Sequence, residues 1–395
     1  MLPDRVLRLG LAGTRGVHVV LRAVLACAGG VAAFPFSGSG QVARWTLERT
    51  VTIGDALDPE TGLTRVGSVI GHSGRLLVGQ PREQRIRIFS QEGDLLGFIG
   101  RQGEGPGEFE WVSGMGLHRG FVWVNDRVLR RIQYFDGEYR VVSSRRMRGH
   151  PTLRSNPPLV RGILPDGSMI AALGRLVPQI VAFPDRPEPV IRFDPEGRLR
   201  DTVAVLTGRD NDVKIPRERG SVAFLSLPGS DRSLFEAAPD GSGFAVVHRE
   251  TATSDERHTY RVIRFDSRAD TAWAHTFPYD PIPVSRAWRS RNLEARARGE
   301  NAHGRRVLER AYDALKFFPP IDDLHAGADG TTWLLVRTGV DSFEWEVLDD
   351  SGRVTARLAP PAAGRIKWSD ADAAWFTETD ELDVPYLVRY AIHRP

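Results

Sequence analysis

One stretch of the chain shows its repeating unit most clearly, Phe121-Val122-Trp123-Val124-Asn125 followed by Arg131-Ile132-Gln133-Tyr134-Phe135. In both runs β-branched and aromatic side chains alternate with polar ones, which is typical of half-buried β-strands. A short turn ending at Gly120 separates the first run from an earlier apolar segment. The unit is therefore expected to be a meander of strands joined by tight turns.

The same unit occurs six times along the chain. The second strands of the copies lie at residues 75–79, 121–125, 168–172, 244–248, 333–337 and 374–377. The third strands lie at residues 85–89, 131–135, 190–193, 262–265, 344–348 and 387–390, and their ends are 46, 58, 72, 83 and 42 residues apart. The shortest spacings match the roughly 40 to 50 residues of a four-stranded propeller blade, and the longer ones require insertions.

A fourth strand completes five of the six copies, at residues 95–99, 139–142, 199–205, 271–277 and 353–358. The sixth copy has none, but residues 45–53 form an unpaired strand ahead of the first copy and can supply it. Closing the ring with strands from both ends removes an open sheet edge. The sequence thus predicts an all-β fold, a single six-bladed β-propeller over residues 44–395.

The chain resembles the NHL repeat over three runs, residues 100–109 (GRQGEGPGEF), 122–126 (VWVND) and 131–136 (RIQYFD). The body as a whole is similar to bacterial secreted six-bladed propellers of that type, sharply over residues 66–136 and in pattern only over residues 162–392. The resemblance implies a six-bladed propeller. It implies no single activity, because related propellers include protein binders, RNA binders, lactonases and lyases.

Composition and charge restrict the classes of partner. With 395 residues and 41% hydrophobic content, the chain can bury a sizeable core. The formal net charge is +3, and the first 34 residues alone carry that charge, four arginines against Asp4, so the body is neutral overall. A body with both signs interspersed has no large field to steer a polyanion. We therefore predict no nucleic-acid partner.

Residues 1–34 are predicted to be an export segment that precedes a linker at residues 35–43. Arginines come first, and the apolar run 23–34 that follows is too short for a stable membrane span. Val31-Ala32-Ala33 offers the small residues that a signal peptidase accepts. Val24-Leu25-Ala26-Cys27 loosely resembles a bacterial lipobox, so a lipid anchor on Cys27 is the alternative to cleavage after Ala33, and a frayed helix is a third interpretation. We expect a periplasmic or extracellular protein without a disulfide within the chain, because Cys27 is the only cysteine.

Residues 285–316 depart from the repeat. Apolar side chains at helical spacing are interspersed with many arginines, Ser285 can cap a first helix, and Gly299 and Gly304 are expected breaks. The pattern predicts two short amphipathic helices inserted between blades four and five, over about residues 285–317. The arginines indicate either a solvated helical face or an anionic partner.

Catalytic motifs were not found in the sequence. There is no Gly-x-Ser-x-Gly elbow, no cysteine pair and no His-Glu-x-x-His. Residues 103–107 are predicted to be an inter-blade turn rather than a phosphate loop, because a strand from Phe109 and not a helix is expected to follow. Asp126 and Arg131 are expected to form a structural ion pair. The acidic segments 210–212 and 380–383 lack the ligand spacing of a calcium loop.

Histidine spacing gives no metal site. His72 and His118 belong to turns between first and second strands, His248 ends a second strand, and His325 lies within a first strand. These positions lie at opposite ends of a blade, so the four histidines are not expected to bind one metal ion together.

The direction of the strands predicts which face binds. Turns between strands one and two, and between three and four, lie at one end of the ring and are all short, whereas connections between strands two and three and between blades lie at the other end. All the long connections belong to this second set, which we call the long-connection face: residues 148–158, 174–189, 207–231, 250–258 and 279–320. Insertions gathered on one face often mark a binding face, although they would also serve merely to cap the channel.

Polar residues at strand ends on the long-connection face are therefore the predicted site, near the mouth of the central channel. They are Asp126, Arg161, His248, Asp323, Arg337, Lys367 and Glu378. The first hypothesis is a module that binds a protein, peptide or small-molecule ligand without a cofactor. The second is a lactonase-like or lyase-like enzyme that holds Ca²⁺ or Zn²⁺ on the channel axis.

Overall fold

The computed structural model describes residues 42–147, 159–172, 187–216, 222–361 and 364–395, apart from positions 56 and 59. Residues Val42–Pro395 form one compact unit. The predicted export segment and Cys27 lie outside the described residues, as do most of the connections at 148–158 and 174–189. In the described residues no helix is long and apolar enough to cross a membrane.

Blades 1 to 3 are four-stranded antiparallel sheets with consecutive strands side by side. Blade 1 holds β3 (Val69–His72), β4 (Arg75–Gln80), β5 (Arg85–Ser90) and β6 (Leu95–Ile99), with a 3-10 turn at Pro81–Glu83. Blade 2 holds β7 (Val112–His118), β8 (Phe121–Asp126), β9 (Arg131–Phe135) and β10 (Val141–Arg146). Blade 3 holds β11 (Leu159–Ile163), β12 (Met169–Ala172), β13 (Glu188–Phe193) and β14 (Leu199–Leu206).

Blades 4 to 6 repeat this plan. Blade 4 holds β17 (Leu234–Ala237), β18 (Phe244–His248), β19 (His258–Phe265) and β20 (Thr271–Tyr279). Blade 5 holds β21 (Ile321–Ala326), β22 (Thr332–Arg337), β23 (Phe343–Leu348) and β24 (Val354–Leu358). Blade 6 holds β25 (Arg365–Ser369), β26 (Ala373–Thr379) and β27 (Pro385–His393), and its outer strand is β2 (Thr46–Ile53).

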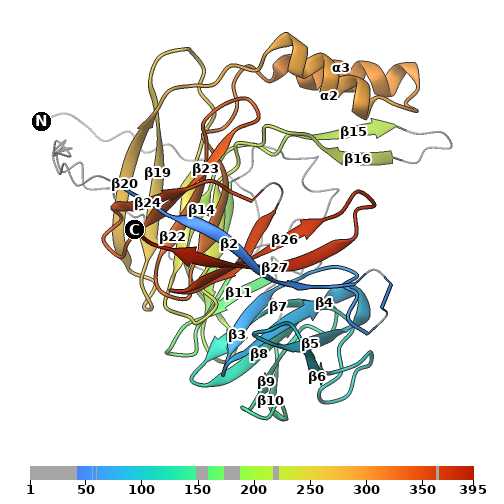
Figure 1. The fold of residues 1–395 in the computed structure, drawn as a ribbon, viewed down its shortest axis with the longest axis vertical. Helices are drawn as coiled ribbons and strands as arrows, with labels where there is room; N and C mark the ends of the chain where they lie inside the picture. The colour runs from blue at the N-terminus through green and yellow to red at the C-terminus, as the bar shows by residue number, and fades with distance from the viewer. Residues whose placement is uncertain are drawn as a thin grey trace, which may run out of the picture. The chain divides into compact units, whose positions relative to one another are not determined.

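Ring closure by an N-terminal strand is confirmed. β2 pairs antiparallel with β27, from Thr46 opposite His393 to Ile53 opposite Leu387. The first strands of the six blades contact one another in the order β3, β7, β11, β17, β21, β25 and back to β3, so they surround a central channel. The meeting of the first (blue) and last (red) parts of the chain is visible in Figure 1. One pairing was not predicted, the short parallel bridge of β1 (Ala43–Arg44) to β24.

Aspartates fix the tight turn between the third and fourth strands. Asp136 Oδ1 accepts hydrogen bonds from the backbone N–H groups of Glu138 and Arg140, at 3.0 and 2.9 Å. Asp194, Asp266 and Asp349 each accept from the N–H four residues ahead in the same way. This is why an Asp so often follows the third strand in the sequence, since its carboxylate satisfies turn N–H groups.

The turn between blades 1 and 2 is held differently from the expected ion pair. Asp126 Oδ2 accepts from the N–H of Glu110 at 2.7 Å, and its Oδ1 accepts from Val128 and Leu129 at 3.0 Å. Arg131 donates to the carbonyl oxygens of Gly105 and Glu108, both at 2.8 Å. The predicted Asp126–Arg131 ion pair is therefore wrong, although both residues have structural roles. Residues 103–107 do form the inter-blade turn, and β7 begins at Val112 rather than at Phe109.

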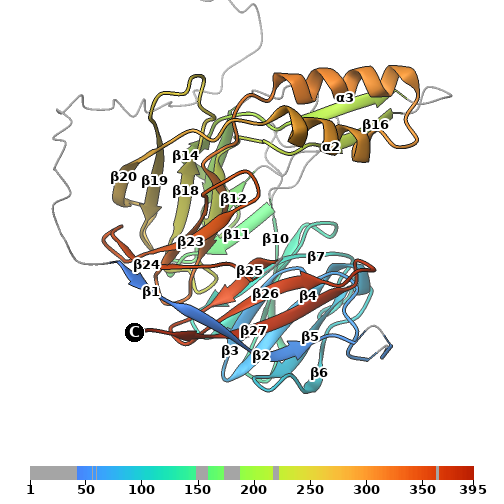
Figure 2. The ribbon, with the colours of Figure 1, turned by 45° about the horizontal axis from the view of Figure 1, so that its top comes forward.

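Two insertions build a separate module beside the ring (Figure 1 and Figure 2). The connection from blade 3 to blade 4 contains a hairpin, β15 (Asp212–Pro216) and β16 (Val222–Ser226), which the sequence did not reveal. The connection from blade 4 to blade 5 contains α2 (Arg286–Arg296) and α3 (Ala302–Ala314), as predicted. The two helices and the hairpin share one hydrophobic core, centred on Ile215, Leu308 and Tyr312. We call this the insertion module.

The caps of the two helices correct one detail of the prediction. Ser285 caps α2, because its hydroxyl accepts a hydrogen bond from the Trp288 N–H at 3.1 Å. Gly299, with a φ of +82°, separates the helices. Gly304 is not a break. It lies in the first turn of α3, where its N–H donates to the Asn301 side chain at 2.9 Å, so Asn301 is the cap.

Candidate functional site

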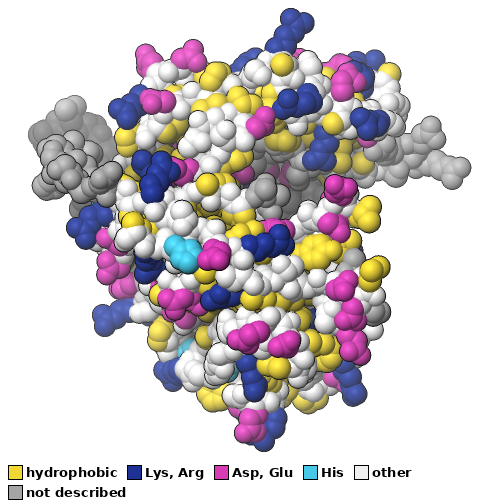
Figure 3. Space-filling view, viewed as in Figure 1, with side chains coloured by type: hydrophobic (Ala, Val, Ile, Leu, Met, Phe, Trp, Pro, Cys, Tyr) yellow, Lys and Arg dark blue, Asp and Glu magenta, His cyan; other side chains and the backbone are white. Residues whose placement is uncertain are grey.

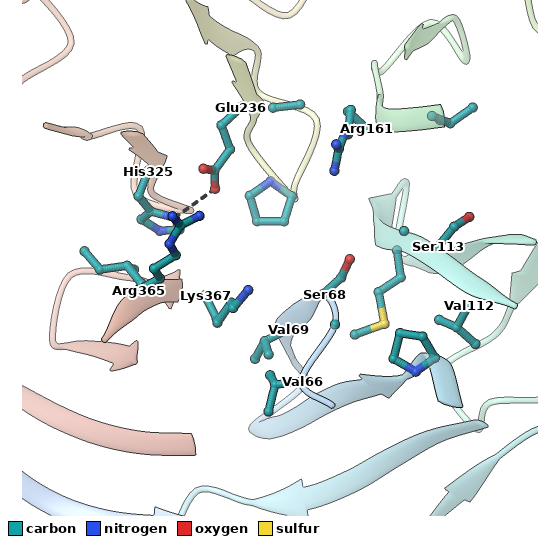
Figure 4. Close-up of a pocket in the computed structure, with 18 of the residues that line it drawn as sticks. Val66, Ser68, Val69, Val112, Ser113, Arg161, Glu236, His325, Arg365 and Lys367 are labelled. Atoms are coloured by element: carbon teal, nitrogen blue, oxygen red, sulfur yellow. Dashed lines mark hydrogen bonds and ion pairs between the residues drawn. The ribbon is translucent and has the colours of Figure 1, made fainter. Parts of the chain in front are cut away.

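The first strands of all six blades contribute to a cavity of about 460 Å³ in the central channel. This volume lies in the range of about 300–1,000 Å³ that is usual for ligand sites. Most lining residues come from the beginnings of first strands, where the chain enters from the long-connection face. Figure 4 shows side chains from different blades pointing into the same space.

Most of the charged side chains of the wall come from blades 3 to 6. Glu236 projects from blade 4, Asp323 and His325 from blade 5, and Arg365 and Lys367 from blade 6, while Arg161 projects from blade 3. On the facing wall, blade 1 contributes Ser68 and Val69, and blade 2 contributes Met115. The cavity is therefore asymmetric, with most of its charges on blades 3 to 6 and Arg65 alone beside blade 1.

Glu236 is held by a hydrogen-bonded chain that crosses three blades. His325 Nδ1 lies 2.9 Å from Glu236 Oε1, and His325 Nε2 lies 3.1 Å from Ser369 Oγ. A carboxylate only accepts, so the Nδ1 proton is donated to Glu236, and a neutral imidazole then accepts the Ser369 hydroxyl proton at Nε2. Ser369 is 0% and His325 2% exposed. The Ser369 hydroxyl is too buried to contact a substrate in the cavity. The three hydrogen-bonded residues therefore orient Glu236, and Ser369 does not act as a nucleophile.

Asp323 and Arg365 form a long ion pair near the mouth of the cavity, with 3.9 Å between Oδ2 and Nε. Burial raises the pKa of Asp323, and the nearby Glu236 carboxylate adds to that increase while Arg365 opposes it. Two carboxylates and one guanidinium thus share this part of the wall. The positive charge of Arg365 and the raised pKa of Asp323 both reduce the net negative charge of this part of the wall.

The side chains of Arg161 and Lys367, and that of Arg65 at the mouth, have no hydrogen bond and no ion pair with any residue that the structure describes. The Arg161 side chain stays accessible to water although protein encloses it on most sides, as expected for a group that projects into a channel. Burial lowers the pKa of Arg161 and of Lys367, and Glu236 partly offsets both decreases. The two cations therefore bear a desolvation cost that no direct partner in the described residues repays.

A second hollow of about 630 Å³ adjoins the cavity at the long-connection face. The two share Arg65, Val66, Asp323, Arg365 and Lys367. Its outer part is formed by β26 and the turn after it, with Glu378 and Asp383. The channel thus opens outward between blades 5, 6 and 1.

The structure brings three of the seven predicted site residues into the cavity, namely Arg161, Asp323 and Lys367. Glu378 lines the adjoining hollow, where its Oε1 accepts a hydrogen bond from the Tyr390 hydroxyl. These four residues come from three different blades.

The other three predicted residues lie elsewhere. Asp126 is fully buried at the inter-blade turn. His248 Nδ1 contacts Ser233 Oγ at 2.9 Å and Thr207 Oγ1 at 3.2 Å, so it fastens the chain where the hairpin insertion begins and ends. Arg337 stacks on Phe318 and Phe343, with its guanidinium carbon 4.5 and 4.3 Å from the ring centres, and pairs with Asp322 at 2.8 Å. These contacts give it a packing role.

Sequence reasoning missed Glu236, Arg365 and Arg65, and it assigned no role to His325. A signal was present, because first strands line the channel of a propeller and these residues lie on or just before first strands. The repeat pattern is strongest in the second and third strands, so the predicted site contained fewer residues of the first strands.

The described residues contain no group of three His, Cys, Asp or Glu side chains placed to hold a metal ion. The histidines of the described blades are also dispersed. His72 and His118 lie at the ends of β3 and β7 toward the short turns, whereas His325 binds Glu236 and Ser369.

Comparisons with known proteins find only remote similarities. No protein-family model matches the chain, and no curated protein matches it. Among solved structures, a candidate exported protein of Bacteroides fragilis is 12% identical, with a TM-score of 0.42, over 89% of this chain and 95% of that one. A member of the DUF4221 family from Bacteroides vulgatus is 10% identical, with a TM-score of 0.49, over 90% and 99%.

A virginiamycin B lyase from Staphylococcus aureus is 11% identical, with a TM-score of 0.39, over 88% of this chain and 99% of that one. Similarities this low carry no argument about activity. The six-bladed propeller itself rests on the strand pairing described above.

Proposed function

We propose that the protein is a binding module whose ligand occupies the central channel and enters from the long-connection face. The observation that carries the proposal is a cavity of about 460 Å³ into which two cations project, Arg161 and Lys367, that have no side-chain partner among the described residues. Unpaired charges in an enclosed space cost free energy, which a bound ligand of opposite charge would offset. Glu236, fixed by His325, adds an oriented acceptor to the same wall.

A ligand screen that compares the wild type with a variant whose channel is blocked tests this proposal. Ser68→Trp places an indole in the cavity, and Ser226→Trp makes the same change on the exposed side of β16 as a control. Melting temperatures are measured with panels of small carboxylates, sugars, nucleosides and amino acids. At least one panel should stabilise the wild type and Ser226→Trp but not Ser68→Trp. Equal stabilisation of all three proteins, or of none by any panel, would contradict the proposal.

We also propose that the protein is exported. Export is supported by the arginines and the apolar run of residues 1–34 and by the resemblance of residues 66–136 to NHL repeats of secreted propellers. Intact mass measurement of the protein made in its natural host tests it. The expected mass corresponds to a chain that begins after Ala33 or at a lipidated Cys27. A cytoplasmic chain that begins at Met1 would contradict export.

A further inference from the structure

The order of the blades places Arg161 and Lys367, two cations without a side-chain partner among the described residues, on opposite sides of the cavity. Arg161 belongs to β11 of blade 3 and Lys367 to β25 of blade 6. In a closed ring of six blades these positions are diametrically opposed. Figure 4 shows the two side chains entering the cavity from opposite sides.

The remaining charges of the wall restrict where a ligand carries its own charge. Glu236 of blade 4 and Asp323 of blade 5 lie between the two cations along one side of the ring. Each has a neighbour already, His325 at 2.9 Å and Arg365 at 3.9 Å. Their carboxylates would repel an anionic group placed beside them. Negative charge on a ligand is therefore favoured near Arg161 at one end and near Lys367 at the other, where Arg65 and Arg365 add positive charge.

The other side of the ring is suited to an uncharged middle. Val69 and Met115 contribute apolar surface from blades 1 and 2. Ser113 is already engaged, because its hydroxyl donates to the Asn125 carbonyl oxygen at 2.8 Å and accepts from the Asn125 amide at 3.0 Å. The Ser68 hydroxyl has no side-chain hydrogen bond among the described residues. Apart from Arg65 at the mouth, one hydroxyl and a few apolar groups thus face the cavity on this side.

We infer that the ligand is a small dicarboxylate that spans the channel, with one carboxylate on Arg161 and the other on Lys367. This inference rests on the proposed function and specifies the ligand of that site. A guanidinium binds a carboxylate through two parallel hydrogen bonds, and an ammonium binds one as a point charge. A compact dianion of the same charge, such as sulfate, reaches only one of the two cations. A monocarboxylate leaves one cation unpaired.

Calorimetric titration with four probes tests the inference: succinate, glutarate, sulfate and butyrate. At least one of the two dicarboxylates should bind at one site per chain, and at least about tenfold more tightly than sulfate or butyrate, since each of these probes makes one charge-assisted contact fewer. Arg161→Met and Lys367→Met should each weaken that binding by about tenfold or more. Arg298→Met and Lys214→Met, which remove exposed cations of the insertion module, should leave it unchanged.

The outcomes separate this inference from the proposal on which it rests. Sulfate or butyrate binding as tightly as the dicarboxylates, or dicarboxylate binding that survives both channel substitutions, would overturn the inference. If another panel binds in a way that Ser68→Trp blocks while neither dicarboxylate binds, the channel is still a binding site and only the ligand class is wrong. If no panel binds, both are wrong.

Discussion

Lys367 is an ammonium group in a cavity where burial lowers its pKa. Replacement of an enclosed, unpaired charge by an apolar side chain is often stabilising. We expect Lys367→Met to raise the stability of the ligand-free protein by about 1 kcal/mol, measured by thermal or urea unfolding, while it weakens ligand binding by about tenfold or more. Lys214→Met on the exposed surface should change stability by less than about 0.5 kcal/mol. A clear loss of stability in Lys367→Met would show that Lys367 has a structural role instead.

Asp323 gives a prediction about pH. Its pKa is raised in the folded protein, chiefly by burial, so the folded state binds its proton more tightly than the unfolded state does. The stability contributed by this group is therefore present at low pH and is lost as the pH rises through the folded pKa. The stability of wild type relative to Asp323→Asn should fall between about pH 4 and neutrality. A difference that is constant over this range, or that grows with pH, would contradict the assignment.

Among the elements, the insertion module folds around its own core. Leu308 of α3 is 0% exposed within it, and Leu334 of blade 5 is equally buried within the ring. A Leu→Ala change at such sites costs about 2–5 kcal/mol. We expect Leu308→Ala to accelerate amide hydrogen exchange in α2, α3, β15 and β16 while the blades stay protected. Leu334→Ala should accelerate exchange in the blades. Uniform acceleration by Leu308→Ala would mean that the module and the ring unfold as one.

The closing strand is the second element with a testable role. Removal of β2 would expose the edge of β27, which β2 covers along Thr46–Ile53. A chain that begins at residue 54 should lose solubility or melt at a much lower temperature. A chain that begins at residue 45 keeps β2 and loses, among the described strands, only β1, so it should melt like the full chain. Equal melting of the two truncated chains would contradict closure by β2.

The elements also show what could be predicted from the sequence. The blades were predictable because apolar and polar side chains alternate along each half-buried strand. The turn aspartates likewise bind backbone N–H groups only two to four positions away. The hairpin β15–β16 was not, because its partner helices follow about 70 residues later and supply the core that stabilises it. The amphipathic pattern of residues 285–316 indicated a buried face but not the segment that covers it.

For the whole molecule, side chains of both signs are mixed over the face drawn in Figure 3, as expected for a body that is neutral overall. The charged residues of the candidate site lie inside the ring. Three of the predicted site residues could be found from strand direction alone. The pairing of Glu236 with His325, and the opposition of Arg161 and Lys367, depend on which blades are neighbours. That relation arises only when the ring closes.

The central claim is that the channel binds a ligand from the long-connection face. A crystal structure grown with glutarate tests it most directly. The account predicts density within the cavity, with one carboxylate at Arg161 and the other at Lys367, and no displacement of the His325–Glu236 pair. Density at the short-turn face near His72 and His118, or an empty channel at a glutarate concentration that stabilises the protein, would contradict it.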